Sequence, residues 1–140
     1  MKHLALLIIM FLLGSSPAIL AQKPDRLSQI QFAASQHEIV SVLIQEGRYA
    51  QVLPEFSKIL DLDLSGHDEK LVVQSVWNLS QPLRERREYS LAHQMVGQTL
   101  QQTEERQNKF YLLMLKGKLF QEEGRLSEAL EVYKQAQSLK

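Results

Sequence analysis

The 140-residue chain contains no cysteine, and this absence excludes several kinds of architecture and chemistry at once. A disulfide framework, a thiolate zinc site and a cysteine nucleophile all need the thiol group. The acylated cysteine that anchors bacterial lipoproteins is excluded for the same reason. The fold must therefore be held together by the packing of apolar side chains, for which a chain of this length is sufficient.

An excess of charge of either sign is also absent. The chain carries 16 Lys and Arg against 16 Asp and Glu, which gives a formal net charge of zero. Proteins that bind nucleic acid normally carry a basic excess, so we expect no nucleic-acid partner. A polybasic membrane-binding patch and an acidic tail are not predicted either. Hydrophobic residues make up 44% and charged residues 23%, which is typical of one globular domain.

Sequence motifs of catalysis and metal binding are missing as well. The histidines in the body of the chain, His37, His67 and His93, do not follow the spacing of a zinc-binding helix. The glycine-rich motifs that bind phosphates and dinucleotides are not found, nor is the nucleophile elbow of hydrolases. We therefore predict that the protein is not an enzyme and that it uses no cofactor, metal or small-molecule substrate.

The N-terminal apolar run is too short for a transmembrane helix. Residues 4–13 are all apolar, but a spanning helix needs about 20 such residues. A basic start precedes the run, and a Gly-Ser-Ser-Pro break and small residues follow it, which is the pattern of a secretory signal peptide. We predict a signal peptide over 1–21, cleaved after Ala21 or Ala18. The domain 22–140 would then be periplasmic or secreted, with no stable membrane span. An uncleaved N-terminal helix that anchors the chain is the alternative.

After the signal the sequence predicts helices almost throughout. Alternating apolar runs with Asn-Gly turns, which would indicate strands, are missing, and stretches rich in Gln, Glu, Leu and Ala dominate. Ser65 and Asp68 have the spacing of a capping box at the start of the third helix. By their start and stop signals, the expected helices run over about 25–46, 47–62, 68–86, 90–102, 108–123 and 127–139.

The turns inside the helix pairs form an internal repeat. Tyr49, Tyr89 and Leu126 occupy equivalent positions in three turns, at spacings of 40 and 37 residues. Gly47 and Gly124 begin two of these turns, since glycine readily adopts the left-handed conformation that ends a helix. Apolar residues recur before and after each turn: Leu43, Leu83 and Phe120, then Phe56, Val96 and Tyr133. One helix pair cannot bury this face alone, so neighbouring pairs must stack.

Residues 115–136 resemble a unit of the tetratricopeptide repeat (TPR) family. The matching residues are Gly117, Gly124, Ala129, Tyr133 and Ala136. The two earlier units depart from the pattern, with Arg87 in place of the turn glycine and with Pro54 and Pro82 inside expected helices. The resemblance implies an all-α fold of stacked antiparallel helix pairs, a TPR-like α-solenoid. It would have about three repeats, with units at about 33–66, 67–107 and 108–140.

The resemblance also implies a function. In TPR proteins the first helix of each pair lines a groove that holds an extended peptide or a partner helix. Repeat alignment places candidate partner-binding residues on the second and third units: Trp77, Gln81, Arg84, Met114, Lys118 and Gln121. The first unit would add His37, Ser41 and Ile44. Trp77 has two interpretations, because a tryptophan in a packed helix can belong to the core or to a binding surface.

We therefore expect an exported TPR-like module that binds a protein or peptide, as an interaction or scaffolding module. A membrane-anchored sensory or regulatory input domain, held by an uncleaved N-terminal helix, is the alternative. Leu130 and Leu139 have no predicted neighbour, which leaves a homo-oligomer open as well.

Overall fold

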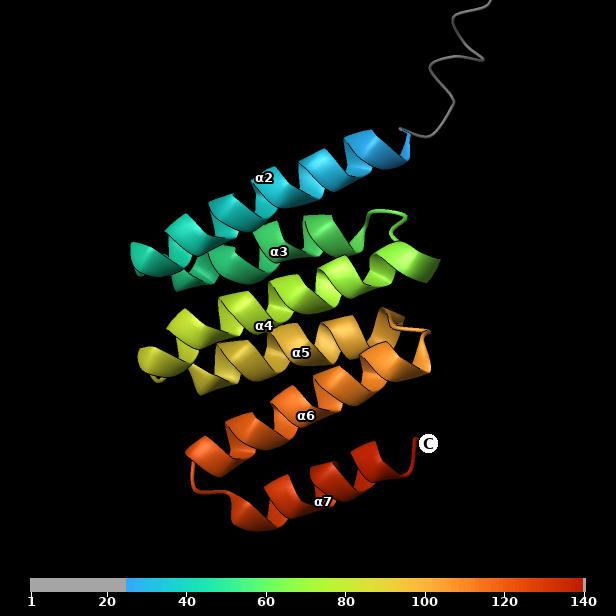
Figure 1. Ribbon diagram of the computed structural model, residues 1–140. Helices are drawn as coiled ribbons and strands as arrows, with labels where there is room; N and C mark the ends of the chain where they lie inside the picture. The colour runs from blue at the N-terminus through green and yellow to red at the C-terminus, as the bar shows by residue number, and fades with distance from the viewer. Residues whose placement is uncertain (1–24, 140) are drawn as a thin grey trace, which may run out of the picture.

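The computed structural model describes residues 25–139, and this part of the chain is helical, without strands. The all-α prediction is confirmed, whereas the predicted signal peptide, 1–21, lies outside the described residues. Six α-helices and two short 3₁₀ turns follow one another along the chain (Figure 1). The α-helices are α2 (Arg26–Gln45), α3 (Val52–Leu60), α4 (Glu69–Glu85), α5 (Tyr89–Gln102), α6 (Arg106–Glu122) and α7 (Leu126–Gln137). The 3₁₀ turns are Tyr49–Gln51 and Gly66–Asp68.

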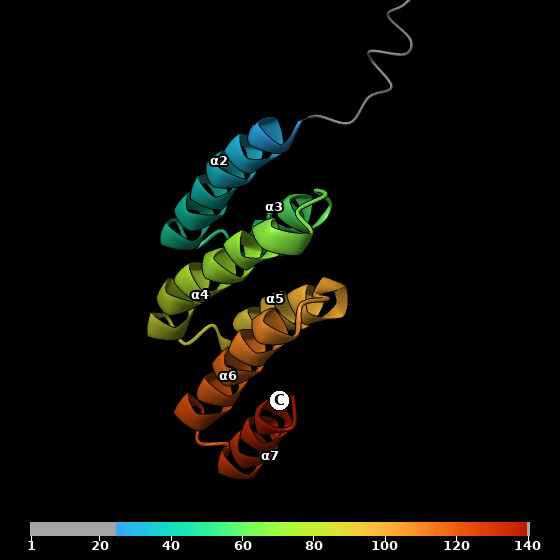
Figure 2. The same ribbon diagram turned by 45° about the vertical axis from the view of Figure 1, so that its right-hand side comes forward.

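The helices stack in chain order and form two layers. Successive helices pack as the pairs α2/α3, α4/α5 and α6/α7. In one layer α4 lies between α2 and α6, and in the other α3 packs on α5. Figure 2 shows the first layer, α2, α4 and α6, side by side along one edge of the stack. We call the outer surface of these three helices the α4 face.

The three turns inside the helix pairs share one hydrogen-bonding pattern. A backbone N–H after the turn donates to the carbonyl five residues earlier: Arg48 to Leu43 (2.9 Å), Glu88 to Leu83 (2.8 Å) and Arg125 to Phe120 (2.8 Å). The residue just before each donor has a left-handed backbone: Gly47 (φ 70°), Arg87 (φ 59°) and Gly124 (φ 79°). This is the Schellman arrangement that satisfies the last carbonyls of a helix. The turns therefore repeat in geometry although Arg87 breaks the sequence pattern.

The core runs continuously from α2 to α6. Its largest fully buried side chains include Phe56, Ile59, Leu79, Leu83, Met95, Leu112, Leu115 and Leu119. A separate small cluster of Phe120, Ala129 and Val132 lies between α6 and α7. The last helix is thus fixed by its own limited set of apolar contacts.

A close approach between α6 and α7 requires a glycine. A Cβ atom added to Gly117 would lie 2.7 Å from Cδ1 of the Tyr133 ring, far inside van der Waals contact. Tyr133 is half-buried and packs on the cluster of Phe120, Ala129 and Val132. Gly117 therefore leaves the space that the aromatic ring of α7 fills.

Two buried polar side chains hold the loops that connect successive pairs. The side-chain oxygen of Gln29 on α2 accepts from the backbone N–H of Asp63, at 2.8 Å. The Glu69 carboxylate on α4 accepts from the backbone N–H groups of Glu104 and Glu105, both at 3.0 Å. Gln29 and Glu69 are 40 residues apart, the same spacing as Tyr49 and Tyr89. Each first helix thus binds the loop that leads to the next first helix.

The capping box predicted at Ser65 is wrong. The Ser65 side chain forms no capping hydrogen bond, and the 3₁₀ turn Gly66–Asp68 precedes α4. The Asp68 carboxylate instead accepts two hydrogen bonds from the Arg26 guanidinium of α2, at 2.6 and 2.7 Å. These bonds hold the pKa of Asp68 below its usual value. A long-range ion pair between α2 and the start of α4 has replaced the local cap.

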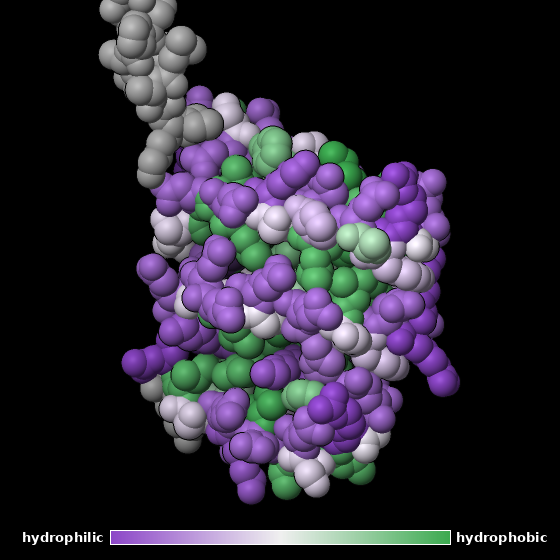
Figure 3. Space-filling view, turned by 180° about the vertical axis from the view of Figure 1, so that it is seen from behind, coloured by the Kyte–Doolittle hydropathy of each residue, from purple (hydrophilic) through white to green (hydrophobic). Residues whose placement is uncertain are grey.

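Apolar side chains remain exposed at both ends of the stack. They are Leu27, Phe32, Ile39 and Val42 on α2, and Leu126 and Leu130 on α7. Seen from behind, Figure 3 shows polar side chains over much of the surface, with apolar surface between them. None of the helices in residues 25–139 combines the length and the apolar character needed to cross a membrane.

Candidate binding surface on the α4 face

The α4 face is hollowed on both sides of α4, and Asn78 contributes to each hollow. One hollow, of about 230 Å³, lies between α2 and α4 and includes His37 and Ser75. Two more lie along the seam between α4 and α6, with volumes of about 570 and 480 Å³. Asn78 is exposed and lines all three, so it occupies the middle of the hollowed surface.

Trp77 belongs partly to the core and partly to this surface. Its side chain is half-buried and packs against the main core cluster. It also lines both hollows of the α4–α6 seam. Both interpretations of Trp77, core and surface, therefore apply, because one part of the indole is packed and another is accessible.

Arg84 is engaged within the protein. Its guanidinium donates two hydrogen bonds to the Glu122 carboxylate of α6, at 2.9 and 2.5 Å. These bonds lower the pKa of Glu122 and raise that of Arg84, and partial burial opposes both shifts. Only 16% of the Arg84 side chain is exposed. Arg84 thus ties α4 to α6 and is not available as the ligand-binding cation that the repeat alignment suggests.

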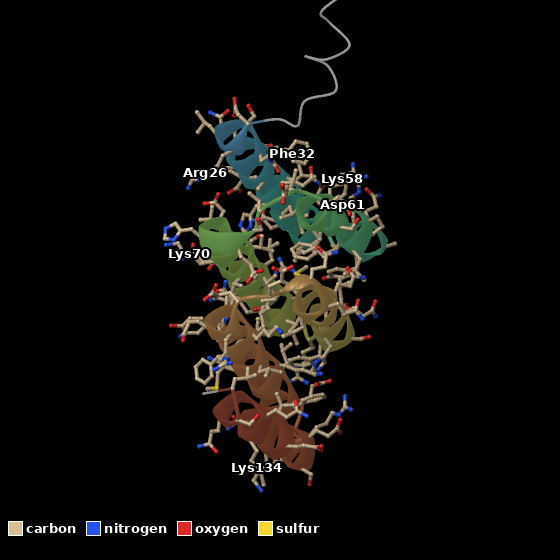
Figure 4. The ribbon with its side chains drawn as sticks, turned by 90° about the vertical axis from the view of Figure 1, so that its right-hand side faces the viewer. Arg26, Phe32, Lys58, Asp61, Lys70 and Lys134 are labelled. Atoms are coloured by element: carbon tan, nitrogen blue, oxygen red, sulfur yellow. The ribbon has the colours of Figure 1, made fainter. Side chains whose placement is uncertain are left out.

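Lys118 and Lys70 supply the accessible positive charge of the seam. Lys118 is exposed on α6 and shares a hollow with Trp77 and Gln81. Lys70 is exposed at the start of α4, in the neighbouring hollow, and its Nζ lies 3.4 Å from Nε2 of His67. Among residues 25–139, neither lysine is within salt-bridge distance of a carboxylate. Figure 4 shows Lys70 on the opposite side of the stack from Lys58 of α3.

The other aligned residues lie elsewhere. Ile44 is fully buried in the core and cannot contact a partner. The side chain of Gln121 accepts a hydrogen bond from the Tyr133 hydroxyl, at 2.9 Å, which directs it toward α7. Met114 and Ser41 are half-buried and do not line the three hollows. Of the aligned residues, the ones that line a hollow of the α4 face are thus His37, Trp77, Gln81, Arg84 and Lys118.

The alignment also missed residues that the structure brings to the seam. These are Lys70, Gln74 and Asn78 of α4, with Asn108 and Tyr111 of α6. A signal was available in the sequence, because positions 70, 74, 77, 78 and 81 follow helical spacing and share one side of α4. Neutral polar residues at such positions do not stand out from solvated surface unless their neighbours in space are known.

His37 and Ser75 are the closest approach to a catalytic pair on this surface. His37 Nδ1 lies 2.6 Å from the Ser75 hydroxyl, across the interface of α2 and α4. Ser75 is in the middle of α4, where backbone N–H groups are committed to the helix and cannot stabilise an oxyanion. The pair therefore acts as a polar contact between helices. Within residues 25–139, no group of three acidic, histidine or cysteine side chains is arranged to hold a metal ion.

No protein-family model, no curated protein and no solved structure matches this chain.

Proposed function

We propose that the protein is a TPR-like module of about three helix pairs whose α4 face binds a segment of another protein. Three features support the repeat. They are the equivalent turns at Leu43, Leu83 and Phe120, the loop contacts of Gln29 and Glu69, and the contact of Gly117 with Tyr133. The binding proposal depends on one observation, that three hollows meet at the exposed Asn78 beside a half-buried Trp77.

The chemistry of these residues suits a polypeptide. A carboxamide side chain can donate to a peptide carbonyl and accept from a peptide N–H at once, and Gln74, Asn78 and Gln81 present three of them on α4. Trp77 offers apolar area with little conformational entropy to lose, as tryptophans do at the centres of protein interfaces. This combination favours main-chain recognition with one apolar side chain bound.

The proposed place of action is outside the cytoplasm, as a periplasmic or secreted protein. The signal-peptide pattern of residues 1–21 supports it. N-terminal sequencing of the protein recovered from the native host tests this step. A start at Gln22 or Ile19 supports export with cleavage, and a start at Met1 favours the membrane-anchored input domain.

Blocking the middle of the α4 face tests the binding proposal. Asn78→Arg places a long side chain where the three hollows meet, at an exposed position whose change should not unfold the helix. Gln94→Arg is the matched control, because it makes the same charge change on the exposed side of α5 in the other layer. Pull-down from the native envelope with each variant should lose the specific partner only with Asn78→Arg. Equal capture by both variants, with helicity intact by circular dichroism, would remove the α4 face from the proposal.

A further inference from the structure

The seam between α4 and α6 carries positive charge at two places that are far apart. Lys70 contributes to one hollow and Lys118 to the other, and the hollows share Trp77 and Asn78. Lys118 lies close to the level of Gln81, because it is one turn before Glu122 on α6, and Glu122 pairs with Arg84, which is about one turn after Gln81 on α4. From position 70 to position 81 a helix rises about 16 Å, and from 70 to 77 about 10 Å. The two ammonium groups thus lie on either side of the indole along the seam.

The remaining charges of the seam are largely compensated. Arg84 and Glu122 neutralise each other through their paired hydrogen bonds. Glu85 also lines the second hollow, and its carboxylate accepts from the Gln81 amide at 3.4 Å. Glu85 is one helical turn beyond Gln81, at the end of α4 away from Lys70. The lysines therefore outnumber the free carboxylates that line the seam. Glu85 would repel a negatively charged ligand only beyond Lys118, at the far end of the seam.

This inference rests on the proposed function and names the chemistry of the ligand. We propose that the α4–α6 seam binds an extended acidic segment. It has two carboxylate side chains four residues apart and a bulky apolar side chain midway between them, and this even spacing puts all three on one side of an extended chain. Four residues of an extended chain span about 13 Å, and the long lysine side chains reach over the remaining separation of about 3 Å along the helix axis. The carboxylates contact Lys70 and Lys118, and the apolar side chain rests on Trp77.

An extended ligand fits this surface better than a helical one. Gln74, Asn78 and Gln81 present carboxamides along the same stretch of α4 that separates the two lysines. The peptide groups of an extended chain are free to pair with them, whereas a helix has already used its own peptide groups internally. The carboxamides would have no main-chain partner in a complex with a helix.

Binding of defined peptides to the full chain tests this inference. The probe is the fluorescently labelled peptide Glu-Ser-Leu-Ser-Glu with blocked termini, measured by fluorescence polarisation at low ionic strength. Its counterparts replace both glutamates by lysine, or place the two glutamates side by side. The first peptide should bind at least tenfold more tightly than either counterpart, and added salt should weaken it. Equal affinity for the acidic and basic peptides, or no binding of either, overturns the inference.

Charge reversal on the protein identifies the contacts. Lys70→Glu and Lys118→Glu should each weaken the acidic peptide about fivefold to tenfold, as expected for one exposed ion pair replaced by a repulsion. Lys134→Glu on α7, at the far end of the stack in Figure 4, is the matched control and should leave the affinity unchanged. Glu85→Gln should tighten binding, because it removes the opposing carboxylate. Equal effects of all three lysine changes would show that binding depends on the net charge of the protein, and would contradict the contacts assigned to Lys70 and Lys118.

The inference and the proposed function can fail separately. One outcome is a native partner that loses binding to Asn78→Arg and still binds Lys70→Glu and Lys118→Glu as it binds the wild type. That result would support the α4 face as the binding surface and refute the acidic ligand. The converse outcome is an acidic peptide that binds through both lysines while no native partner is sensitive to Asn78→Arg. That result would support the contacts assigned to the seam and refute the interaction module.

Discussion

The left-handed backbone of Arg87 is a point of local strain in the second helix pair. Within residues 25–139 it is the only non-glycine residue with a positive φ, and it occupies the place that Gly47 and Gly124 fill in the other pairs. A side chain with a Cβ atom raises the energy of this conformation by about 1 kcal/mol or more. The rest of the turn, including the hydrogen bond from Glu88 to Leu83, compensates for that cost.

Replacing Arg87 by glycine should therefore stabilise the protein. We expect a gain of about 1 kcal/mol, offset in part by the greater freedom of glycine in the unfolded chain, and a melting temperature higher by about 4 °C. Arg86→Gly is the control, since it removes the same charge at a position with φ of −91°. It should lower stability by about 0.5–1 kcal/mol. Thermal melts followed by circular dichroism measure both, and a lower melting temperature for Arg87→Gly would contradict the strain.

Replacement of Gly117 on α6 should have the opposite effect and destabilise the protein. Gly117→Ala drives a methyl group into the ring of Tyr133, and we expect a loss of about 1–3 kcal/mol in urea denaturation. Gly97→Ala on α5 is the matched control, because open space surrounds that position. It should be neutral or stabilising by up to about 1 kcal/mol. If both changes had the same effect, the contact between Gly117 and Tyr133 would not be the reason for the glycine.

At the scale of elements, polar side chains fix how the helix pairs join. Glu69 is buried on α4, and it bonds two backbone N–H groups just before α6 as well as the side-chain amide of Asn108, at 3.0 Å. Arg26 with Asp68, and Arg84 with Glu122, connect successive first helices at opposite ends. The order of the stack is therefore set by directional contacts in addition to the apolar core.

Removal of the Glu69 carboxylate should weaken the junction between the second and third pairs. Glu69→Ala leaves the donors at the start of α6 without a partner, and we expect a loss of about 2–3 kcal/mol in chemical denaturation. Glu104→Ala in the same loop, whose side chain is exposed, should change stability by less than about 0.5 kcal/mol. A small effect of Glu69→Ala would show that the loop is held by packing.

The ion pair of Arg84 and Glu122 predicts a dependence of stability on pH. Hydrogen bonds from Arg84 depress the pKa of Glu122 below its ordinary value of 4.5. The stabilisation is then fully present above pH 4.5 and is lost as the pH falls through the depressed pKa. Glu122→Gln should be less stable than the wild type at pH 7, by about 1 kcal/mol or less because the carboxylate is partly exposed. The difference should vanish near the acid limit of folding, and a constant difference across the pH range would contradict the assignment.

Sequence predicted the elements better than their junctions. The turns at Gly47 and Gly124 were predictable because a helix stop is encoded by the residue in the turn itself. The start of α4 was not, since Asp68 pairs with Arg26, 42 positions earlier in the chain. The candidate surface shows the same limit: repeat alignment included Lys118 and Gln81, which line a hollow, whereas the place of Asn78 depends on the packing of α2 and α6 on either side of α4.

At the scale of the whole molecule, apolar packing is not uniform along the stack. The core cluster joins α2 through α6, whereas α7 packs mainly on α6 through Phe120, Ala129 and Val132. In a stack where each unit contacts only its neighbours, a terminal helix that packs on one neighbour and lies outside the main core cluster opens before the middle of the stack. Native-state hydrogen exchange should therefore give the amides of α7 the lowest protection and those of α4 the highest. Equal protection of both helices would show a single cooperative unit.

The proposed binding surface is the α4 face, and the most direct test is whether a partner contacts this face and not another one. Site-specific photo-crosslinking measures this directly, with the photoreactive amino acid placed at position 78 or, as the control, at position 94 on α5. We predict a discrete crosslinked product from position 78 in cells of the native host and none from position 94. We also predict that the acidic peptide Glu-Ser-Leu-Ser-Glu competes with this product. A product from position 94 with none from position 78 would contradict the central claim.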